Sequence, residues 1–353
     1  MLIGLGALSA AMLLSFGGGF LVRRLLGIVG MWDRPNARSS HSVRTLRGGG
    51  LGIIGPYLVC LAVYVWANES SVGLGLLIAV LIVATVSLLD DIFSLSEAIR
   101  LAGHFLGSLV FLGILGLEWG EEAWWQGHRA LFWFLALAWL VGYTNAFNFM
   151  DGINGLAALQ AAITAGFTAM VVLHYEGMEM TGFILAIIVL AGAALGFAPH
   201  NFPRAQMFMG DIGSVSLGFI LAATSVWAGY RYGWTILVPL TFIHANFVLD
   251  TWVTFLRRLI RGGAWWRPHR EHFYQRLVRS GASHAQVTSI ESILQGVAAL
   301  FLWLYLVMDG PLRWLFPVCV LILWGGFFWY CEQQWLRMVK KEGGRGGEQS
   351  LAK

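Results

Sequence analysis

The chain alternates between long apolar runs and short polar breaks over most of its length. Most runs are about 20 residues long, the length that an α-helix needs to cross the hydrocarbon core of a bilayer. The pattern therefore predicts about eleven membrane-spanning helices. Their expected positions are 2–22, 50–67, 72–89, 100–117, 129–147, 153–173, 180–198, 212–230, 234–256, 289–308 and 312–331.

The composition agrees with this pattern. The 353 residues are 58% hydrophobic and 12% charged, and the mean hydropathy is +0.69, whereas soluble domains carry about 25% charged residues. We expect an all-α, polytopic integral membrane helical bundle, with residues 1–333 forming a single domain. The segment 334–353 combines glycines with charges and is expected to be a disordered cytoplasmic tail.

The basic residues indicate one orientation in the membrane. If the N-terminus is periplasmic, the C-terminus is cytoplasmic and the cytoplasmic segments hold all of the 23 Lys and Arg except Arg129, Arg231 and Arg313. The same rule explains the calculated isoelectric point near 9.1 without a nucleic-acid partner. The first span is followed by basic residues rather than preceded by them, which argues against a cleaved signal peptide.

Two adjacent carboxylates, Asp90 and Asp91, close the apolar run 76–89. A pair of like charges at a membrane boundary is costly unless a cation, a basic residue or water stabilises it, so such pairs often mark functional sites. The alternative is a solvated helix end with no chemical task.

A second polar stretch lies between the fifth and sixth expected spans. Asn145, Asn148 and Asp151 recur every three residues, which would align amides and a carboxylate on one helix face. Gly152 and Gly155 would let backbone or a ligand approach closely. The alternative is a capped junction in which Asp151 is the N-cap of the next span.

A third stretch places Asp211 beside Gly210, Gly213 and Ser214 where another span begins. A helix start offers free N–H groups to phosphate, and Mg²⁺ prefers one or two carboxylates together with phosphate oxygens and water. Here too the alternative is an N-cap.

A basic loop follows the ninth expected span. His269 and His272 are spaced to share a helix face, and Arg270 and Arg276 would supply positive charge for a diphosphate. No third ligand or HExxH pattern accompanies the histidines, which argues against catalytic zinc. An ordinary basic loop is the alternative.

A further basic and glycine-rich stretch, residues 38–52, precedes the second span, and Arg38 and His41 are its candidate substrate contacts. Its glycines would either pack helices closely or admit a phosphate. Because the carboxylate stretches and the basic loop fall on the cytoplasmic side, together they indicate phosphoryl transfer between a nucleotide and a membrane component. A cation-coupled transporter is the alternative, but we find no clear internal repeat and the acidic residues cluster at span ends.

These motifs together resemble the polyprenyl-phosphate N-acetylhexosamine-1-phosphate transferases, the superfamily that contains translocase I of peptidoglycan synthesis. The resemblance runs from about Arg34 to Arg276 and is most specific at Leu89-Asp90-Asp91, at the Asn-x-x-Asn-x-x-Asp-Gly stretch ending at Gly152, and at 208–214. The loop 268–276 is most similar to the branch that initiates lipopolysaccharide O-antigen. The resemblance implies that undecaprenyl phosphate and a UDP-N-acetylhexosamine react at the cytoplasmic face of the bacterial inner membrane, releasing UMP, with Mg²⁺ required and Mn²⁺ as a second candidate.

The resemblance also implies residue roles. Asp211 would be the principal Mg²⁺ ligand, Asp90 the base on the lipid phosphate, and Asp91 an assistant at the metal or the lipid. Asn148 and Asp151 match positions near nucleotide and metal. The matching sugar-nucleotide loop holds the remaining candidates: His269, Arg270, His272 and Arg276.

One departure concerns Asn154, where many relatives carry aspartate. Asparagine still forms hydrogen bonds to a uracil edge but cannot act as a base. Two mechanisms remain open: a one-step displacement, and a two-step route through a phospho-sugar on an aspartate. The sequence also leaves open the identity of the sugar, the glycan pathway and the oligomeric state, for which a homodimer is one candidate.

Overall fold

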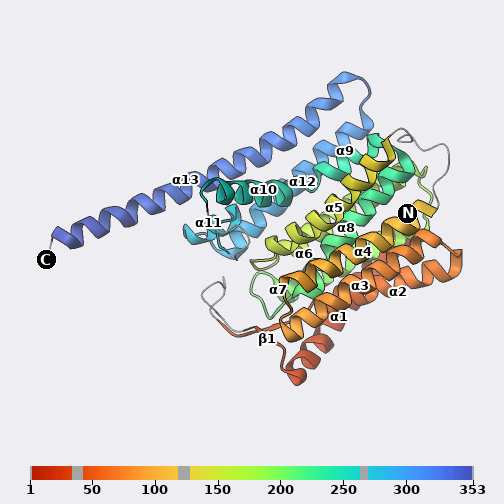
Figure 1. Cartoon of the computed structure of the whole chain (residues 1–353), viewed down its shortest axis with the longest axis horizontal. Helices are drawn as coiled ribbons and strands as arrows, with labels where there is room; N and C mark the ends of the chain where they lie inside the picture. The colour runs from red at the N-terminus through yellow and green to blue at the C-terminus, as the bar shows by residue number, and fades with distance from the viewer. Residues whose placement is uncertain (1, 34–42, 118–127, 263–268, 352–353) are drawn as a thin grey trace.

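The computed structural model describes residues 2–33, 43–117, 128–262 and 269–351, with side chains described as far as Lys341. The described chain is a bundle of α-helices (Figure 1). The helices are α1 (Leu2–Val29), α2 (Leu51–Asn68), α3 (Ser71–Phe93), α4 (Glu97–Leu117), α5 (Arg129–Met150), α6 (Leu156–Tyr175), α7 (Gly182–Asn201), α8 (Asp211–Tyr232), α9 (Trp234–Phe242), α10 (Ala245–Ile260), α11 (Phe273–Arg279), α12 (His284–Val307) and α13 (Leu315–Leu351).

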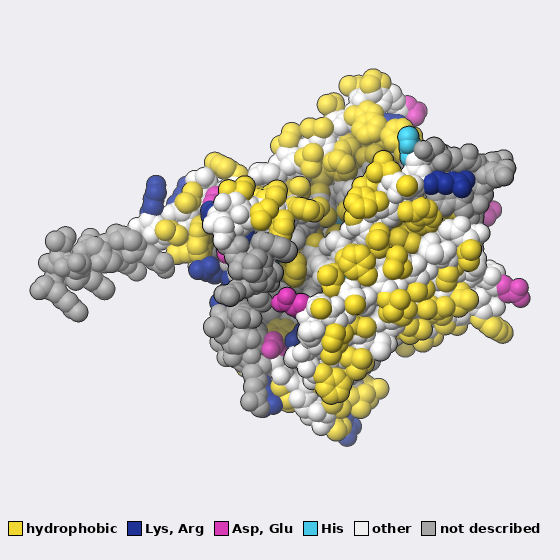
Figure 2. Space-filling model, viewed as in Figure 1, with side chains coloured by type: hydrophobic (Ala, Val, Ile, Leu, Met, Phe, Trp, Pro, Cys, Tyr) yellow, Lys and Arg dark blue, Asp and Glu magenta, His cyan; other side chains and the backbone are white. Residues whose placement is uncertain are grey.

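The helical membrane architecture expected from the apolar pattern is confirmed. Ten helices of the described chain are long and apolar enough to cross a membrane, and α9 with α10 forms a bent pair that brings the number to as many as 11. Hydrophobic side chains cover much of the visible face of the bundle (Figure 2). Because α1 to α8 alternate in direction, the C-terminal ends of odd-numbered helices meet the N-terminal ends of even-numbered ones.

The span expected over 234–256 corresponds to α9 and α10, which are broken at residues 243–244 and meet at an angle of 68°. At the break the Ile243 carbonyl is satisfied by a side chain, because Gln295 of α12 donates to it over 2.7 Å. The buried His244 ring lies 3.3 Å from the Ser225 hydroxyl of α8. The apolar pattern could not show this bend because its cause lies in contacts with other helices.

A small sheet joins segments that are far apart in sequence. It contains β1 (Trp32–Asp33), β2 (Thr45–Arg47) and β3 (Met207–Phe208), with β1 antiparallel to β2 and β2 parallel to β3. Strands of two or three residues are too short to show a sequence period, so the sequence did not predict them. The sheet places the start of α2 beside the start of α8.

The glycine run that opens α2 packs against α8. Gly49 and Gly50 donate backbone hydrogen bonds to the carbonyls of Phe208 and Met209, over 2.9 and 2.8 Å. A Cβ at Gly50 would lie 2.2 Å from the Cα of Gly213. This contact supports the helix-packing interpretation of these two glycines.

The last helix is longer than predicted. It continues from Leu315 to Leu351, past the expected span 312–331 and into the segment 334–353, for which a disordered tail stays a prediction. α10, α11, α12 and α13 form a group beside the main bundle, and α13 projects beyond it (Figure 1).

Gly50→Ala should destabilise the protein by about 1–3 kcal/mol, because the added methyl group meets backbone that cannot move aside. A lower thermal unfolding midpoint of the purified protein in detergent would show this. Gly55→Ala is the matched control, since a Cβ at Gly55 has nothing within 4 Å. Equal midpoints for the two variants would contradict the packing argument.

Candidate active site

Three aspartates and two arginines form an ionic cluster at one end of the bundle. Asp90 and Asp91 end α3, Asp211 begins α8, and Arg47 and Arg100 lie between them. The Arg47 Nε is 2.7 Å from Asp91 Oδ1, and its Nη2 is 2.8 Å from Asp211 Oδ1. The Arg100 Nη1 lies 3.3 Å from Asp90 Oδ2 and 3.7 Å from Asp211 Oδ2. The cluster unites two motifs separated by about 120 residues of chain.

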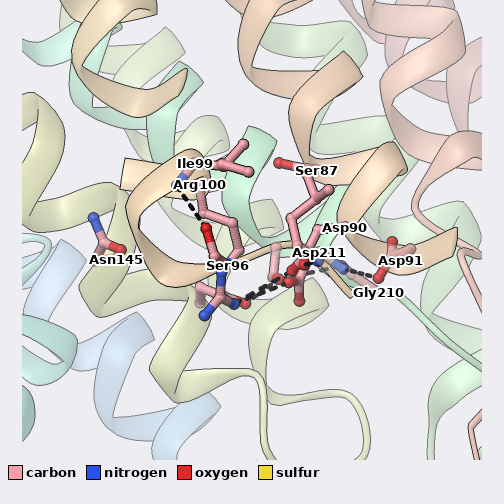
Figure 3. Close-up of polar contacts among 12 residues, drawn as sticks. Ser87, Asp90, Asp91, Ser96, Ile99, Arg100, Asn145, Gly210 and Asp211 are labelled. Carbon is pink, nitrogen blue, oxygen red and sulfur yellow. Dashed lines mark hydrogen bonds and ion pairs between the residues drawn. The ribbon is translucent and has the colours of Figure 1, made fainter. Parts of the chain in front are cut away.

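Asp91 faces away from the other two carboxylates. Its Oδ1 accepts the backbone N–H of Asp211, and its Oδ2 accepts that of Ile212, both over 2.9 Å (Figure 3). Its side chain has 0% exposure. A carboxylate at a helix N-terminus satisfies free N–H groups and interacts favourably with the helix dipole. Asp91 therefore holds the first turn of α8, and both of its oxygens already have protein donors.

Asp90 and Asp211 lie together on the other side of the cluster. Figure 3 shows their carboxylates close to each other and to the Arg100 side chain. The Asp90 Oδ1 accepts the Leu95 backbone N–H over 2.7 Å, which fixes its orientation at the end of α3. Two nearby carboxylates repel each other unless cations stabilise them, and here the arginines supply that charge.

A cavity of about 620 Å³ opens beside this carboxylate pair. Helices α3, α4, α5, α8 and α10 and the loop before α11 contribute to its wall. Of the predicted site residues, five line it: Asp90, Asn148, Asp211, His269 and His272. The same wall includes apolar side chains, namely Val86, Leu101, Val215, Trp252 and Phe255.

The other predicted residues lie elsewhere. The cavity lining does not include Asp91, Asp151, Asn154, Arg270 or Arg276. Arg38 and His41 fall outside the described residues.

The turn after α5 positions Asn148 and Asp151. The Asn148 side-chain oxygen accepts the Ser214 hydroxyl over 2.7 Å and so contacts the first turn of α8. Asp151 follows the last residue of α5, and burial raises the pKa of its carboxyl well above the usual range, with a smaller contribution from the charge of Asp211. The N-cap interpretation is wrong for both Asp151 and Asp211, because Gly155 and Gly210 occupy the N-cap positions of α6 and α8.

Asn154 forms hydrogen bonds that hold neighbouring segments of the chain together. Its side-chain amide donates to the Pro203 carbonyl over 3.2 Å, and its own carbonyl accepts the Thr288 hydroxyl over 2.8 Å. It thereby connects the turn before α6 to the start of α12.

The histidine loop, which carries His269 and His272 before α11, packs directly onto the C-terminal end of α5. The Tyr274 hydroxyl donates to the Phe149 carbonyl over 3.0 Å, and a Cβ at Gly152 would lie 2.1 Å from that hydroxyl oxygen. Burial, and then the neighbouring His272 and Arg258, lower the pKa of His269 to about 4, so the His269 ring is neutral at pH 7. The loop thus brings imidazole groups opposite the carboxylates.

Arg276 stabilises the loop rather than facing the cavity. It is 4% exposed, and its Nη1 lies 2.8 Å from the Glu332 carboxylate of α13. Its Nε donates to the Glu271 carbonyl over 2.9 Å. The guanidinium is therefore used to attach the loop to the last helix.

Sequence reasoning assigned no role to four polar residues of this region: Arg47, Arg100, His104 and Asp250. His104, on α4, is 3% exposed and lines the cavity, with its Nδ1 3.2 Å from the Asn145 amide nitrogen. A lone polar residue inside an apolar run is an available signal for such groups, because burial of a polar side chain requires a partner.

The sequence is similar to known transferases. The model of Glycosyl transferase family 4 matches residues 73–229. A decaprenyl-phosphate N-acetylglucosaminephosphotransferase of Mycobacterium tuberculosis strain H37Rv is 32% identical over 331 residues, covering 84% of this chain and 81% of the relative. A probable undecaprenyl-phosphate N-acetylglucosaminyl 1-phosphate transferase of Bacillus subtilis strain 168 is 28% identical over 312 residues, covering 81% and 83%.

A phospho-N-acetylmuramoyl-pentapeptide-transferase of Lacticaseibacillus paracasei matches a shorter part, with 38% identity over 133 residues, 36% of this chain and 40% of the relative. Fold and cluster define a multi-pass membrane protein with a polar site at one end of the bundle. The chain belongs to the polyprenyl-phosphate N-acetylhexosamine-1-phosphate transferase superfamily, as its motifs predicted.

Asp91→Asn should destabilise the fold by about 1–3 kcal/mol, because the amide nitrogen would face a backbone N–H that loses its acceptor. The measurement is the thermal unfolding midpoint in detergent, with Asp309→Asn, an exposed aspartate of a distant loop, as control. An unchanged midpoint would argue that Asp91 does not hold α8.

Proposed function

We propose that the protein transfers an N-acetylhexosamine 1-phosphate from a UDP-sugar to undecaprenyl phosphate, forming undecaprenyl-diphospho-sugar and UMP. The observation that supports this most is that Asp90, Asp211, His269 and His272 line one cavity. The mycobacterial and Bacillus relatives are named for N-acetylglucosamine, so UDP-N-acetylglucosamine is the first donor to test. Initiation of O-antigen remains a prediction from the resemblance of the loop.

The reaction must bring two anions together. An oxygen of the lipid phosphate forms a bond to the β-phosphorus of the UDP-sugar, while the bond from that phosphorus to the oxygen shared with the α-phosphate breaks and UMP leaves. Arg100 is placed beside both Asp90 and Asp211, where it offsets negative charge. The apolar wall around Trp252 and Phe255 suits the isoprenoid end of the acceptor.

Asp90 is the candidate base on the lipid phosphate. Its carboxylate lines the cavity and is held by Leu95 and Arg100. We favour direct displacement over a phospho-sugar intermediate on an aspartate. Incubation with a donor labelled in the sugar phosphate, without acceptor, decides between them: label trapped on the protein would contradict the direct route.

The residues fit a divalent cation of the Mg²⁺ type. Asp211 and Asp90 line one cavity with adjacent carboxylates. Within the described ranges, no group of three or more acidic, histidine or cysteine side chains could hold a metal ion, so the protein would supply at most two carboxylates. Mg²⁺ commonly uses one or two protein carboxylates and takes its other ligands from phosphate and water. Asp211 would be the principal ligand with Asp90 beside it, and bound Mg²⁺, or Mn²⁺ in its place, would neutralise diphosphate charge.

We further propose that the site faces the cytoplasm in the bacterial inner membrane. The basic residues Arg47, Arg100 and Arg257 lie at the site end of the bundle, as the positive-inside rule requires for a cytoplasmic face. A homodimer remains a candidate assembly.

Membranes containing the protein should release UMP from UDP-N-acetylglucosamine when undecaprenyl phosphate and Mg²⁺ are present, and EDTA should stop the release. Asp211→Asn should lower the rate roughly 10²–10³-fold or more, since it removes charge where phosphate charge is stabilised. Asp309→Asn should retain full activity. No release with a panel of UDP-N-acetylhexosamines would contradict the enzyme and favour the transporter alternative.

Arg47→Lys should reduce the rate roughly tenfold, because an ammonium group cannot reproduce the planar bridge between Asp91 and Asp211. Arg44→Lys is the matched control, since Arg44 stacks on Trp32 at 4.6 Å and is not part of the cluster. Equal rates for both variants would show that the bridge does not position Asp211.

A further inference from the structure

Asp250 is a buried carboxylate directed at the histidine loop. It lies on α10, just after the break from α9, and is 1% exposed. Its Oδ1 is 2.8 Å from the His272 Nδ1. Its two oxygens also accept the Phe273 backbone N–H over 3.2 and 3.0 Å, and the Thr254 hydroxyl donates to Oδ1 over 3.2 Å.

These contacts determine which nitrogen of His272 carries hydrogen. An ionised carboxylate is only an acceptor, and three donors converge on Asp250, so Nδ1 must donate. In the neutral imidazole the lone pair then lies on Nε2. Nδ1 is used by Asp250, Nε2 has no hydrogen-bond partner among the described residues, and the ring lines the cavity.

The position of the His272 ring indicates which group of the substrate Nε2 would contact. His272 and His269 line the cavity together with the Asp90 and Asp211 carboxylates, and their ring centroids are 5.0 Å apart. If the β-phosphorus of the UDP-sugar lies at the carboxylates, the sugar attached to the β-phosphate is the part of the substrate nearest to His272 that is neutral and carries hydrogen-bond donors. The lone pair of an imidazole nitrogen accepts a hydrogen bond from a sugar hydroxyl or an acetamido N–H.

We propose that Asp250 is a positioning residue that sets the His272 tautomer, so that Nε2 accepts a hydrogen bond from the sugar of the nucleotide donor. This rests on the proposed function and deepens it, because it assigns sugar recognition to one atom. His272 contacts substrate, and Asp250 acts through it.

Asp250→Asn tests the tautomer with little change in shape. With the amide oxygen at the Oδ2 position, where it keeps the shorter Phe273 contact of 3.0 Å, the amide N–H₂ takes the Oδ1 position and donates to His272 Nδ1. The ring must move its hydrogen to Nε2, which becomes a donor where an acceptor is needed. Titration calorimetry with the full-length protein in detergent, with Mg²⁺, compares UDP-N-acetylglucosamine with UMP.

We expect Asp250→Asn to raise the Kd for UDP-N-acetylglucosamine roughly 10- to 100-fold, while the Kd for UMP, which lacks the sugar, stays within about twofold. Thr254→Val is the matched control, because it removes a donor to Asp250 and leaves the His272 contact. Retained UMP binding shows that the variant is folded.

His272→Ala provides a second route, since it removes the acceptor and leaves the cap on Phe273. It should show the same selective loss, and Asp250→Asn should add no more than about twofold in the His272→Ala background. Equal losses for both ligands, no loss, or additive effects would overturn the proposal. Wild-type protein that neither binds nor turns over UDP-N-acetylhexosamines would overturn the proposed function as well, whereas active wild type with unaffected variants overturns this inference alone.

Discussion

The candidate site depends on the contact between Asp91 and the start of α8. Two backbone N–H groups of α8 donate to this one carboxylate at the end of α3, and Arg47 joins it to Asp211. Such a contact orients a helix as well as stabilising it, because both oxygens of a planar group are used. The direction of the Asp211 side chain is therefore set by a residue from another helix.

Glycines leave the space that the contact between Asp91 and α8 needs. Gly210 adopts a φ of +73°, and a Cβ there would lie 2.6 Å from the Asp91 carboxylate. Gly50 and Gly213 allow α2 and α8 to approach within backbone contact. The glycines of two motifs thus support the geometry of the carboxylates, and a ligand is not needed to explain them.

Much of the fold followed from the sequence, because a membrane requires long apolar helices and these are visible as runs of residues. The pairing of Asp90 with Asp211 in one cavity, and the presence of His269 and His272 there, were also expected from the motifs. The bend at His244 and the partner of His272 were not. His272 contacts Asp250, and the Ile243 carbonyl at the bend accepts a hydrogen bond from Gln295. Both contacts join segments that are distant in sequence.

The roles of neighbouring residues were likewise beyond sequence patterns. Asp90 and Asp91 are adjacent in the chain, yet one faces the cavity and the other holds α8, because successive helical residues point about 100° apart. Arg276 belongs to the loop motif, but its guanidinium contacts Glu332 of α13.

We propose that one cavity holds the sugar nucleotide between the carboxylate pair and the loop that carries His269 and His272. A structure of the full-length protein in a lipid nanodisc with UDP-N-acetylglucosamine and Mg²⁺ is the direct test. We expect diphosphate density beside Asp90 and Asp211, with the sugar facing His272. A nucleotide bound outside this cavity, or with its diphosphate away from Asp211, would contradict it.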